Sequence, residues 1–453
     1  MNLLRDKKST RWGVLLIISF VMFAAYVASD NIFAVETTLK GDLYQISESE
    51  YSSLAGAYSI FNVYLFMLIF GGIILDKMGI RFTGTLSAIL MVLGIGMMTY
   101  SFFSLRTLVA SGAEIATVKF LGDTLRLPVL LAVVGMGIYG VGAEIAGITA
   151  TKVIAKWFIG YELALAMGLQ LALARLGTGL AYGTTPQIVS AFSGNVGIAV
   201  LIGLVLLTIG LFAFLAYCVY DKKLDKQIKE QGIKEAESSP EEEFNFSDIL
   251  AVIKNPAFWM IALLCLLFYA AVNPFLKYST GMMVEKFGIN QELAGLFPMI
   301  LPMGCIVLTP LFGGIFDKKG HGADLMILGA GIITAVHAVF ALLPNGASPI
   351  IPIFLMVMLG IGFALLPSAM WPSIAKIIPA KQLGTAMALT FYIQNIGFIF
   401  VPKAINAIKA ANSDYMWVSV FFAGLGLVAI LLASGIKVLD KVKKYGLQEP
   451  NIQ

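Results

Sequence analysis

Apolar residues in this chain gather in long runs, and most charged residues fall between those runs. Twelve runs of about 20 residues or more lie at 12–34, 51–75, 82–103, 127–151, 162–187, 196–220, 256–284, 292–316, 323–343, 350–375, 384–407 and 416–437. A helix of that length crosses the ~30 Å hydrocarbon core of a bilayer. Because no water is available there, each run must satisfy its own backbone amides. The pattern therefore predicts an all-α membrane protein with twelve transmembrane helices.

The basic residues predict how these helices are oriented. If the N-terminus is cytoplasmic, 22 of the 31 Lys and Arg residues lie in cytoplasmic segments and 6 in outer segments. Cytoplasmic loops are enriched in Lys and Arg, so we predict that the N- and C-termini are both cytoplasmic. The longest polar stretch, 221–255, is expected to be a cytoplasmic linker between six-helix bundles at 1–220 and 256–437, with a cytoplasmic tail at 438–453.

An internal repeat supports this division. The pattern Gly-x-x-x-Asp-Lys-x-Gly occurs at 72–79 and again at 313–320. A second match aligns residues 140–177 with residues 360–397, including glycines at both ends of the match. Two halves of six helices repeated in parallel are typical of one large class of transporters. We therefore expect two pseudo-symmetric six-helix bundles.

Composition excludes other classes of protein. The chain is 58% hydrophobic and 13% charged, whereas soluble domains have about 25% charged residues. A net charge of +4 is too small for a nucleic-acid-binding surface. The three cysteines stand at no metal-ligand spacing, and His321 and His337 have no catalytic arrangement around them in the sequence. We therefore predict that the protein is not an enzyme and has no cofactor or metal.

A few charged residues fall within the predicted membrane, where each costs ~2.5–3.5 kcal/mol and usually marks a pathway or pocket. Inside the runs are Glu144, Arg175, Lys277 and Lys403, and Asp30 lies near the outer end of the first run. For Lys277 and Lys403, extension of the amine to the membrane surface is an open alternative. Asp30 is close enough to the outer surface that solvation is an equally good interpretation.

Glu144 and Arg175 are the strongest candidates for a substrate site. Helical rise places Glu144 about 12 Å and Arg175 about 20 Å from the cytoplasmic ends of their helices, so both lie in the hydrocarbon core. The repeat aligns them with Ala364 and Asn395, so the two charges are absent from the other half. A polar ligand needs its anchors only once, whereas scaffold residues should appear in both halves. A structural buried ion pair is the alternative.

The repeated glycine–aspartate pattern resembles the loop motif of the major facilitator superfamily, and the resemblance extends over the whole chain. It implies a conformational gate at the motif, formed by Gly72, Asp76, Lys77, Gly79, Arg81 and Asp317. On physical grounds, Gly72 would allow close helix approach and Gly79 a tight turn. A neighbouring helix N-terminus or Arg81 would compensate Asp76. A solvated turn is the simpler interpretation.

Several short segments resemble the lysosomal dipeptide transporter branch of that superfamily. They include Asp30-Asn31, Tyr58-Ser59, Gly142-x-Glu144, Ala174-Arg175, Phe268-Tyr269, Trp371-Pro372 and Gln394-Asn395. The resemblance implies a dipeptide carrier whose pocket acid, base and tryptophan are Glu144, Arg175 and Trp371. The candidate substrate-binding residues are Glu144, Arg175, Trp371, Tyr269, Tyr58, Asn395, Gln394, Asp30 and Lys277. By analogy alone, the resemblance also allows for an accessory subunit.

The chemistry of these residues suits a small zwitterion independently of the resemblance. Glu144 can bind an ammonium group, and the planar guanidinium of Arg175 can bind a carboxylate through two hydrogen bonds. Tyr58, Tyr269 and Trp371 can line side-chain pockets, although packing between helices explains each of them equally well. We predict a secondary-active or facilitative transporter of small zwitterionic solutes, dipeptides above all, that works by alternating access. Proton symport and uniport both fit.

One alternative keeps the fold but changes the cargo. A drug or metabolite antiporter of the same superfamily would export amphipathic compounds and would tolerate the loss of Arg175. Because the sequence shows no long N-terminal targeting tail, we expect the protein in a bacterial inner (plasma) membrane, surrounded by the lipid bilayer and without a nucleic-acid partner.

Overall fold

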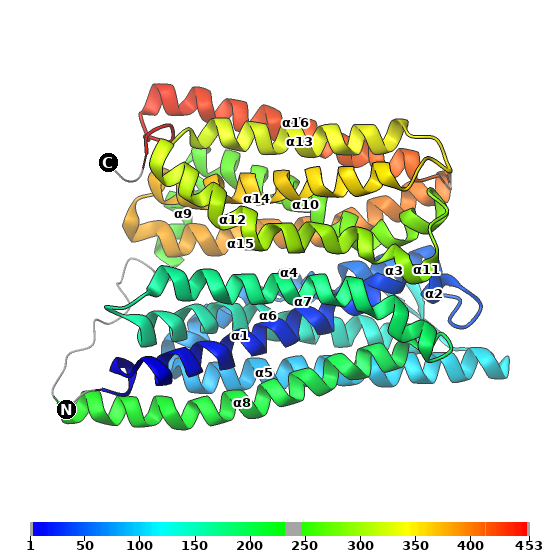
Figure 1. The fold of residues 1–453 in the computed structure, drawn as a ribbon, viewed down its shortest axis with the longest axis horizontal. Helices are drawn as coiled ribbons and strands as arrows, with labels where there is room; N and C mark the ends of the chain where they lie inside the picture. The colour runs from blue at the N-terminus through cyan, green and yellow to red at the C-terminus, as the bar shows by residue number, and fades with distance from the viewer. Residues whose placement is uncertain (1–2, 232–245, 413, 451–453) are drawn as a thin grey trace.

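The computed structural model describes residues 3–231, 246–412 and 414–450, and it is helical along most of that length (Figure 1). The N-terminal helices and strands are α1 (Lys8–Asp30), α2 (Glu36–Lys40), α3 (Glu48–Gly56), α4 (Ile60–Tyr64), α5 (Met67–Ser111), β1 (Thr117–Phe120), β2 (Asp123–Arg126), α6 (Leu127–Phe158), α7 (Leu163–Ala191) and α8 (Val196–Glu230). The C-terminal helices are α9 (Ile249–Ile253), α10 (Pro256–Glu285), α11 (Gln291–Ala294), α12 (Leu296–Lys319), α13 (Gly322–Leu342), α14 (Ile350–Ile377), α15 (Leu383–Ala411) and α16 (Tyr415–Lys443).

The long helices make this a multi-pass membrane protein. Among the described residues, 10 helices are long and apolar enough to cross a membrane, and a pair bent by 60° would make 11. That pair combines the segment Glu48–Tyr64 with Met67–Leu75. The run at 162–187 forms α7, which has 29 residues but is not among those helices. It carries Gln, Arg, Gly and Thr residues among its apolar ones and packs between α1 and α12.

The helices form two groups with the same internal packing. In the first group α1 packs against α7 and α8, and α5 packs against α6 and α8. In the second group α10 packs against α15 and α16, and α13 packs against α14 and α16. Figure 1 shows the groups stacked one above the other, with both chain ends at the same end of the helices. The groups meet where α7 contacts α12 and where α3 contacts α15.

Repeated glycines occupy equivalent structural positions in the two groups. Gly79 and Gly320, aligned by the repeat, have φ angles of +76° and +71°, which L-residues with a Cβ rarely adopt. Gly79 thus makes the sharp turn expected of it, inside a segment otherwise continuous as α5. Gly140 lies at a helix contact, because an added Cβ would stand 2.0 Å from the carbonyl oxygen of Tyr58. Glycine therefore permits close packing in α6, as it does elsewhere between membrane helices.

The expectation of an all-α fold misses one short element. Strands β1 and β2 form an antiparallel hairpin in the connection between α5 and α6. Leu121 and Gly122 at its tip both have positive φ, as a two-residue hairpin turn requires. Asp123 of the hairpin accepts hydrogen bonds from Ser49 and Ser53, which attaches the hairpin to α3.

Other boundaries also differ from the sequence expectations. The linker predicted at 221–255 is not wholly a solvated loop, because α8 continues to Glu230 and Asp221 is buried in ion pairs. Residues 232–245 of that stretch lie outside the described residues. The run at 51–75 is broken, with Phe66 in a left-handed conformation between α4 and α5. The first run is broken as well: α1 ends at Asp30, and a 3-10 turn over Asn31–Val35 leads into α2.

Candidate functional site

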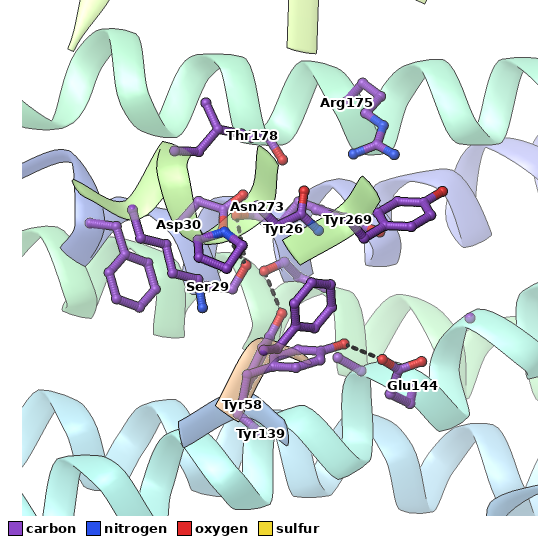
Figure 2. Close-up of a pocket in the computed structure, with 18 of the residues that line it drawn as sticks. Tyr26, Ser29, Asp30, Tyr58, Tyr139, Glu144, Arg175, Thr178, Tyr269 and Asn273 are labelled. Atoms are coloured by element: carbon purple, nitrogen blue, oxygen red, sulfur yellow. Dashed lines mark hydrogen bonds between the residues drawn. The ribbon is translucent and has the colours of Figure 1, made fainter. Parts of the chain in front are cut away.

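A cavity of about 330 Å³ lies between the two helix groups. Its lining comes from α1, α6 and α7 on one side and from α10, α14 and α15 on the other. Figure 2 shows the side chains that project into it. Eight of the nine sequence-predicted binding residues line it, namely Glu144, Arg175, Trp371, Tyr269, Tyr58, Gln394, Asp30 and Lys277.

Glu144 projects into the cavity from α6. The hydroxyl of Tyr58 donates a hydrogen bond to its carboxylate across 3.1 Å. No described Lys, Arg or His lies within 4.0 Å of this carboxylate, so Glu144 forms no ion pair with any of them. Figure 2 places Glu144 and Arg175 on different helices, with the centre of the cavity between them. The two charges face a common space without neutralising each other directly.

Arg175 projects into the same cavity from α7. The described residues include no carboxylate within ion-pair distance of its guanidinium, which instead lies 5.3 Å from the ring centre of Phe363. A buried ion pair between Arg175 and Glu144, the structural alternative, is therefore not what the structure contains. A guanidinium in this setting has its forked N–H donors available to an incoming carboxylate.

Asp30 and Lys277 form a second charged region of the cavity. One carboxylate oxygen of Asp30 lies 3.1 Å from the hydroxyl of Ser29. The amine of Lys277 donates to the carbonyl of Ala55 and lies 4.5 Å from the ring centre of Phe33. Lys277 thus faces the cavity and α3 and does not extend to a membrane surface. Lys403 lies outside the cavity lining and pairs with Asp123 of the hairpin at 3.4 Å.

Aromatic and amide side chains complete the wall formed by the second helix group. The indole N–H of Trp371 donates to the hydroxyl of Tyr269 across 3.2 Å, and its ring stacks on Phe391 at 4.7 Å between centroids. Gln394 lines the cavity, with its amide oxygen 3.3 Å from the thiol of Cys265. Asn395 does not line it: its side chain bonds Ser59 and the backbone of Phe391.

Further polar residues, which the sequence analysis did not predict, also line the cavity. They are Tyr26, Ser29, Tyr139, Thr178, Tyr182 and Asn273. Helical spacing is the signal that could have found them. Tyr26 precedes Asp30 by four residues, Thr178 follows Arg175 by three, and Asn273 lies four residues from both Tyr269 and Lys277. Such residues share one face of a helix.

The gate motif is only partly as expected. An added Cβ at Gly72 would meet nothing within 4 Å, so the close helix approach predicted there is wrong. Gly71 makes that approach instead, because its Cβ would stand 2.7 Å from the side chain of Ile145. The side chain of Asp76 lies outside the described residues. Lys77 is exposed, and Asp317 lies near the end of α12.

Arg81 does form a charged network, but its described partners come from α8. It pairs with Asp221 at 2.8 Å and with Asp225. Lys156 of α6 reaches the same two carboxylates, at 2.9 Å from Asp221. The network therefore ties α5, α6 and α8 together within the first helix group, close to the chain ends.

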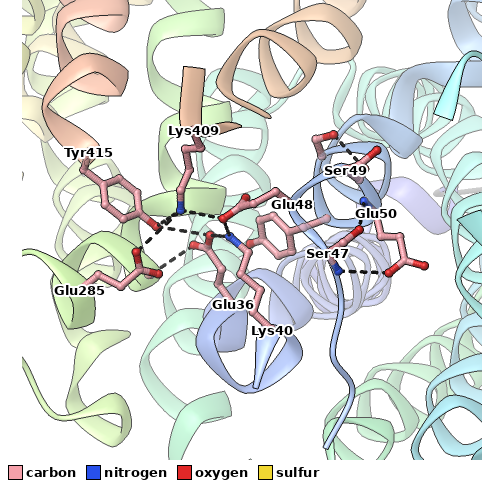
Figure 3. Close-up of polar contacts among 12 residues, drawn as sticks. Glu36, Lys40, Ser47, Glu48, Ser49, Glu50, Glu285, Lys409 and Tyr415 are labelled. Atoms are coloured by element: carbon pink, nitrogen blue, oxygen red, sulfur yellow. Dashed lines mark hydrogen bonds and ion pairs between the residues drawn. The ribbon is translucent and has the colours of Figure 1, made fainter. Parts of the chain in front are cut away.

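A second network joins the two helix groups at the opposite end of the molecule (Figure 3). We call it the cross-bundle ion cluster; it comprises Glu36, Lys40, Glu48, Glu285, Lys409 and Tyr415. Lys40 bridges Glu36 and Glu48 at 2.6 Å and 2.7 Å. Lys409 of α15 lies 2.9 Å from Glu48 and 3.8 Å from Glu285. The cluster joins the groups at the end of the molecule opposite the chain ends.

Comparison with known proteins identifies the family. Residues 15–402 match the model of the Major Facilitator Superfamily. The chain belongs to this superfamily. It is therefore a multi-pass membrane transporter and not an enzyme. Among the described residues, no group of three or more His, Cys, Asp or Glu side chains is arranged to hold a metal ion.

Individual proteins are similar to this chain over most of its length. The chain is 27% identical over 432 residues to the human lysosomal dipeptide transporter MFSD1, covering 92% of this chain and 84% of the relative. It is 28% identical over 444 residues to the same transporter of Danio rerio, covering 96% and 88%. The crystal structure of a D-xylose-proton symporter superposes with a TM-score of 0.70 over 93% of this chain and 97% of the symporter. Its 16% identity makes that a likeness of fold alone.

Proposed function

We propose that this transporter carries small zwitterionic solutes, dipeptides in particular, across the membrane by alternating access. The observation that carries the proposal is the pair of opposite charges, Glu144 and Arg175, which face one cavity without forming an ion pair with each other. A charge held in a low-dielectric site without a partner is costly. A ligand that brings both an ammonium and a carboxylate removes that cost at both residues.

The size of the cavity fits this class of solute. At about 330 Å³ it stands at the lower end of the range of small-molecule sites, ~300–1,000 Å³. The two ends of an extended dipeptide are at most ~7 Å apart, given ~3.3–3.6 Å per residue. Trp371, Tyr269 and Tyr58 would supply rigid surfaces for its side chains. The names of the relatives, lysosomal dipeptide transporters, support the same substrate class.

Alternating access would use the junction between the helix groups. The cross-bundle ion cluster closes one end of the junction and would have to open for the cavity to face the other side. We assign the groups to bundles 1–220 and 256–437, with α7 as the twelfth span beside the bent pair. The excess of Lys and Arg near the chain ends supports cytoplasmic termini. The ion cluster would then lie on the outer side.

The alternative of an antiporter for amphipathic compounds has less support. A cavity for such compounds needs a large apolar surface and one acid. This cavity carries two acids and two bases, Asp30, Glu144, Arg175 and Lys277. Their formal charges sum to zero, which suits a zwitterion better than a lipophilic cation.

Counterflow in proteoliposomes tests the proposal. Vesicles preloaded with unlabelled dipeptide should take up labelled dipeptide through the wild-type protein, and a dipeptide panel should compete. Glu144→Gln and Arg175→Ala should each lose most of this exchange, whereas Asp42→Asn, an exposed acid outside the cavity, should not. Wild-type exchange in both cavity variants would overturn the site assignment. Transport of lipophilic cations without dipeptide competition would favour the antiporter.

A further inference from the structure

Helix α15 of the second group packs along α3 of the first, and this α3–α15 seam runs from the cross-bundle ion cluster towards the cavity. Midway along the seam, an added Cβ at Gly56 would stand 3.3 Å from the backbone oxygen of Ile399. Just beyond α3, the hydroxyl of Ser59 donates a hydrogen bond to the amide oxygen of Asn395 across 2.5 Å. Because helices move as rigid elements, opening the ion cluster would part Ser59 from Asn395 as well.

Both polar atoms of the Asn395 side chain are bonded within the protein. An amide carries one oxygen acceptor and two N–H donors. The oxygen accepts from Ser59, an N–H donates to the backbone oxygen of Phe391 across 3.0 Å, and the side chain also hydrogen-bonds the carboxylate of Glu144. Asn395 is fully buried and does not line the cavity. It therefore contacts the acid that faces the substrate and not the substrate itself.

The internal repeat places Asn395 at the position that Arg175 occupies in the first group. A guanidinium beside Glu144 would pair with it, and a substrate ammonium would have to displace that partner. A neutral amide holds the same carboxylate and leaves its negative charge in place. An ionised carboxylate offers about four acceptor positions, of which Tyr58 and Asn395 take two. The rest are available to an ammonium in the cavity.

We propose that Asn395 is a positioning residue that orients Glu144 for the ammonium of the substrate, and that it does so only while the α3–α15 seam is closed. The task of the oriented acid rests on the proposed function, whereas the bonds of Asn395 stand on the geometry. Coupling of this kind is reciprocal. If the closed seam strengthens ammonium binding, a bound ammonium stabilises the closed seam by the same factor. Loss of the Asn395 amide should remove both effects together.

Competition between a free dipeptide and its N-acetylated form tests the orienting role. Each compound inhibits counterflow of labelled dipeptide, and the ratio of their inhibition constants measures how strongly the site recognises the ammonium. Asn395→Ala should lower that ratio about tenfold, the effect of one hydrogen bond to a charged group. Ser59→Ala should lower it too, and the double variant should go no lower than Asn395→Ala, because the two residues act as one unit. Thr390→Val is the matched control, since Thr390 is buried on α15 and its hydroxyl bonds its own helix.

The ratio separates an orienting role from a merely structural one. A structural defect would weaken the binding of both compounds by an equal factor and leave the ratio as it is. An unchanged ratio in Asn395→Ala would therefore overturn the proposal, whatever happens to the counterflow rate. A wild-type ratio of one would contradict the proposed function, since Glu144 would then bind no ammonium, and the orienting role would fall with it.

A distance measurement in the absence of substrate tests the seam independently. Spin labels at exposed positions 114 and 345 report whether the end with the ion cluster is open. Without dipeptide, Asn395→Ala should raise the open population severalfold, because it loses bonds between the groups, whereas Thr390→Val should match the wild type. Added dipeptide should favour the closed end in the wild type but not in Asn395→Ala.

The two failures are thus distinguishable. If the wild-type ratio is one but Asn395→Ala still opens the end, the contact across the seam stands and the dipeptide proposal falls. If the wild type recognises the ammonium but Asn395→Ala and the wild type give identical distance distributions, the dependence on the seam is overturned. Monodisperse elution confirms that each variant folds, and Ser59→Ala repeats both measurements with a smaller change of side chain.

Discussion

Lys409 of α15 lies 2.9 Å from Glu48 of α3, so one ion pair connects the two helix groups at the end of the molecule opposite both termini. The side chain of Lys409 is 5% exposed, and that of Glu48 is 33% exposed. Lys409 also contacts the hydroxyl of Tyr415 at 3.1 Å. Because these contacts exist only while the groups are together at this end, they stabilise this conformation relative to any in which the end has opened.

Removing the lysine should shift the conformational equilibrium. We expect Lys409→Met to favour the open end by about 1–3 kcal/mol, at least fivefold in population, as is typical of coupling between states. Spin labels at exposed positions 114 and 345, each in a loop at that end, would report the change by pulsed electron resonance. Lys226→Met removes an exposed pair with Glu230 and serves as the control, because surface pairs contribute little. Identical distance distributions in the wild type and Lys409→Met would show that the Lys409 contacts do not stabilise the closed end.

The helix contact at Gly140 should tolerate no side chain. An alanine there would place its Cβ 2.0 Å from the backbone oxygen of Tyr58, so the backbone of one helix must move, at a cost of about 1–3 kcal/mol. The unfolding temperature of Gly140→Ala in detergent should fall. Gly168→Ala is the matched control, since its Cβ meets nothing within 4 Å and alanine favours helix by ~1 kcal/mol. The contact would be unimportant if both variants melted alike.

The hydroxyl of Tyr58 should tune substrate affinity. It donates 3.1 Å to Glu144 and fixes the orientation of that carboxylate. A hydrogen bond to a charged group is worth about 1.5–3 kcal/mol, so Tyr58→Phe should raise the apparent KM for a dipeptide by about tenfold to a hundredfold. Tyr100→Phe, at a side chain 69% exposed on the helix surface, should leave KM unchanged. A KM in Tyr58→Phe equal to that of the wild type would show that the bond has no part in binding.

The sequence predicts the helices well because membrane insertion imposes a simple rule of length and hydropathy. It predicts the interruptions poorly. The turn at Asn31–Val35 and the left-handed Phe66 both fall inside apolar runs. Their conformations depend on neighbouring helices, and a single sequence does not reveal those contacts. The hairpin left only a weak signal in the sequence, the β-branched Thr117 and Val118 before Gly122.

In the candidate site, too, the sequence predicts some residues and misses others. Glu144 and Arg175 were identified because they are charged residues within predicted membrane helices. Placing a charge there is costly, and few structural roles justify that cost. Asn395, chosen from short segment matches, is fully buried, accepts a hydrogen bond from Ser59 and does not line the cavity. Polarity alone does not say which face of a helix meets a cavity. Thr178 and Asn273 were missed because their side chains are unremarkable inside a membrane helix until the fold places them beside Asp30.

The most direct test of the central claim pairs each cavity charge with one end of the substrate. Competition for dipeptide counterflow is measured with an unmodified dipeptide, its N-acetylated form and its C-terminal amide, in the wild type, Glu144→Gln and Arg175→Ala. The account predicts that wild type rejects both blocked forms, that Glu144→Gln no longer distinguishes the N-acetylated form, and that Arg175→Ala no longer distinguishes the amide. If both variants kept the wild-type order of competition, the assignment of these two residues to the ends of a zwitterion would be contradicted.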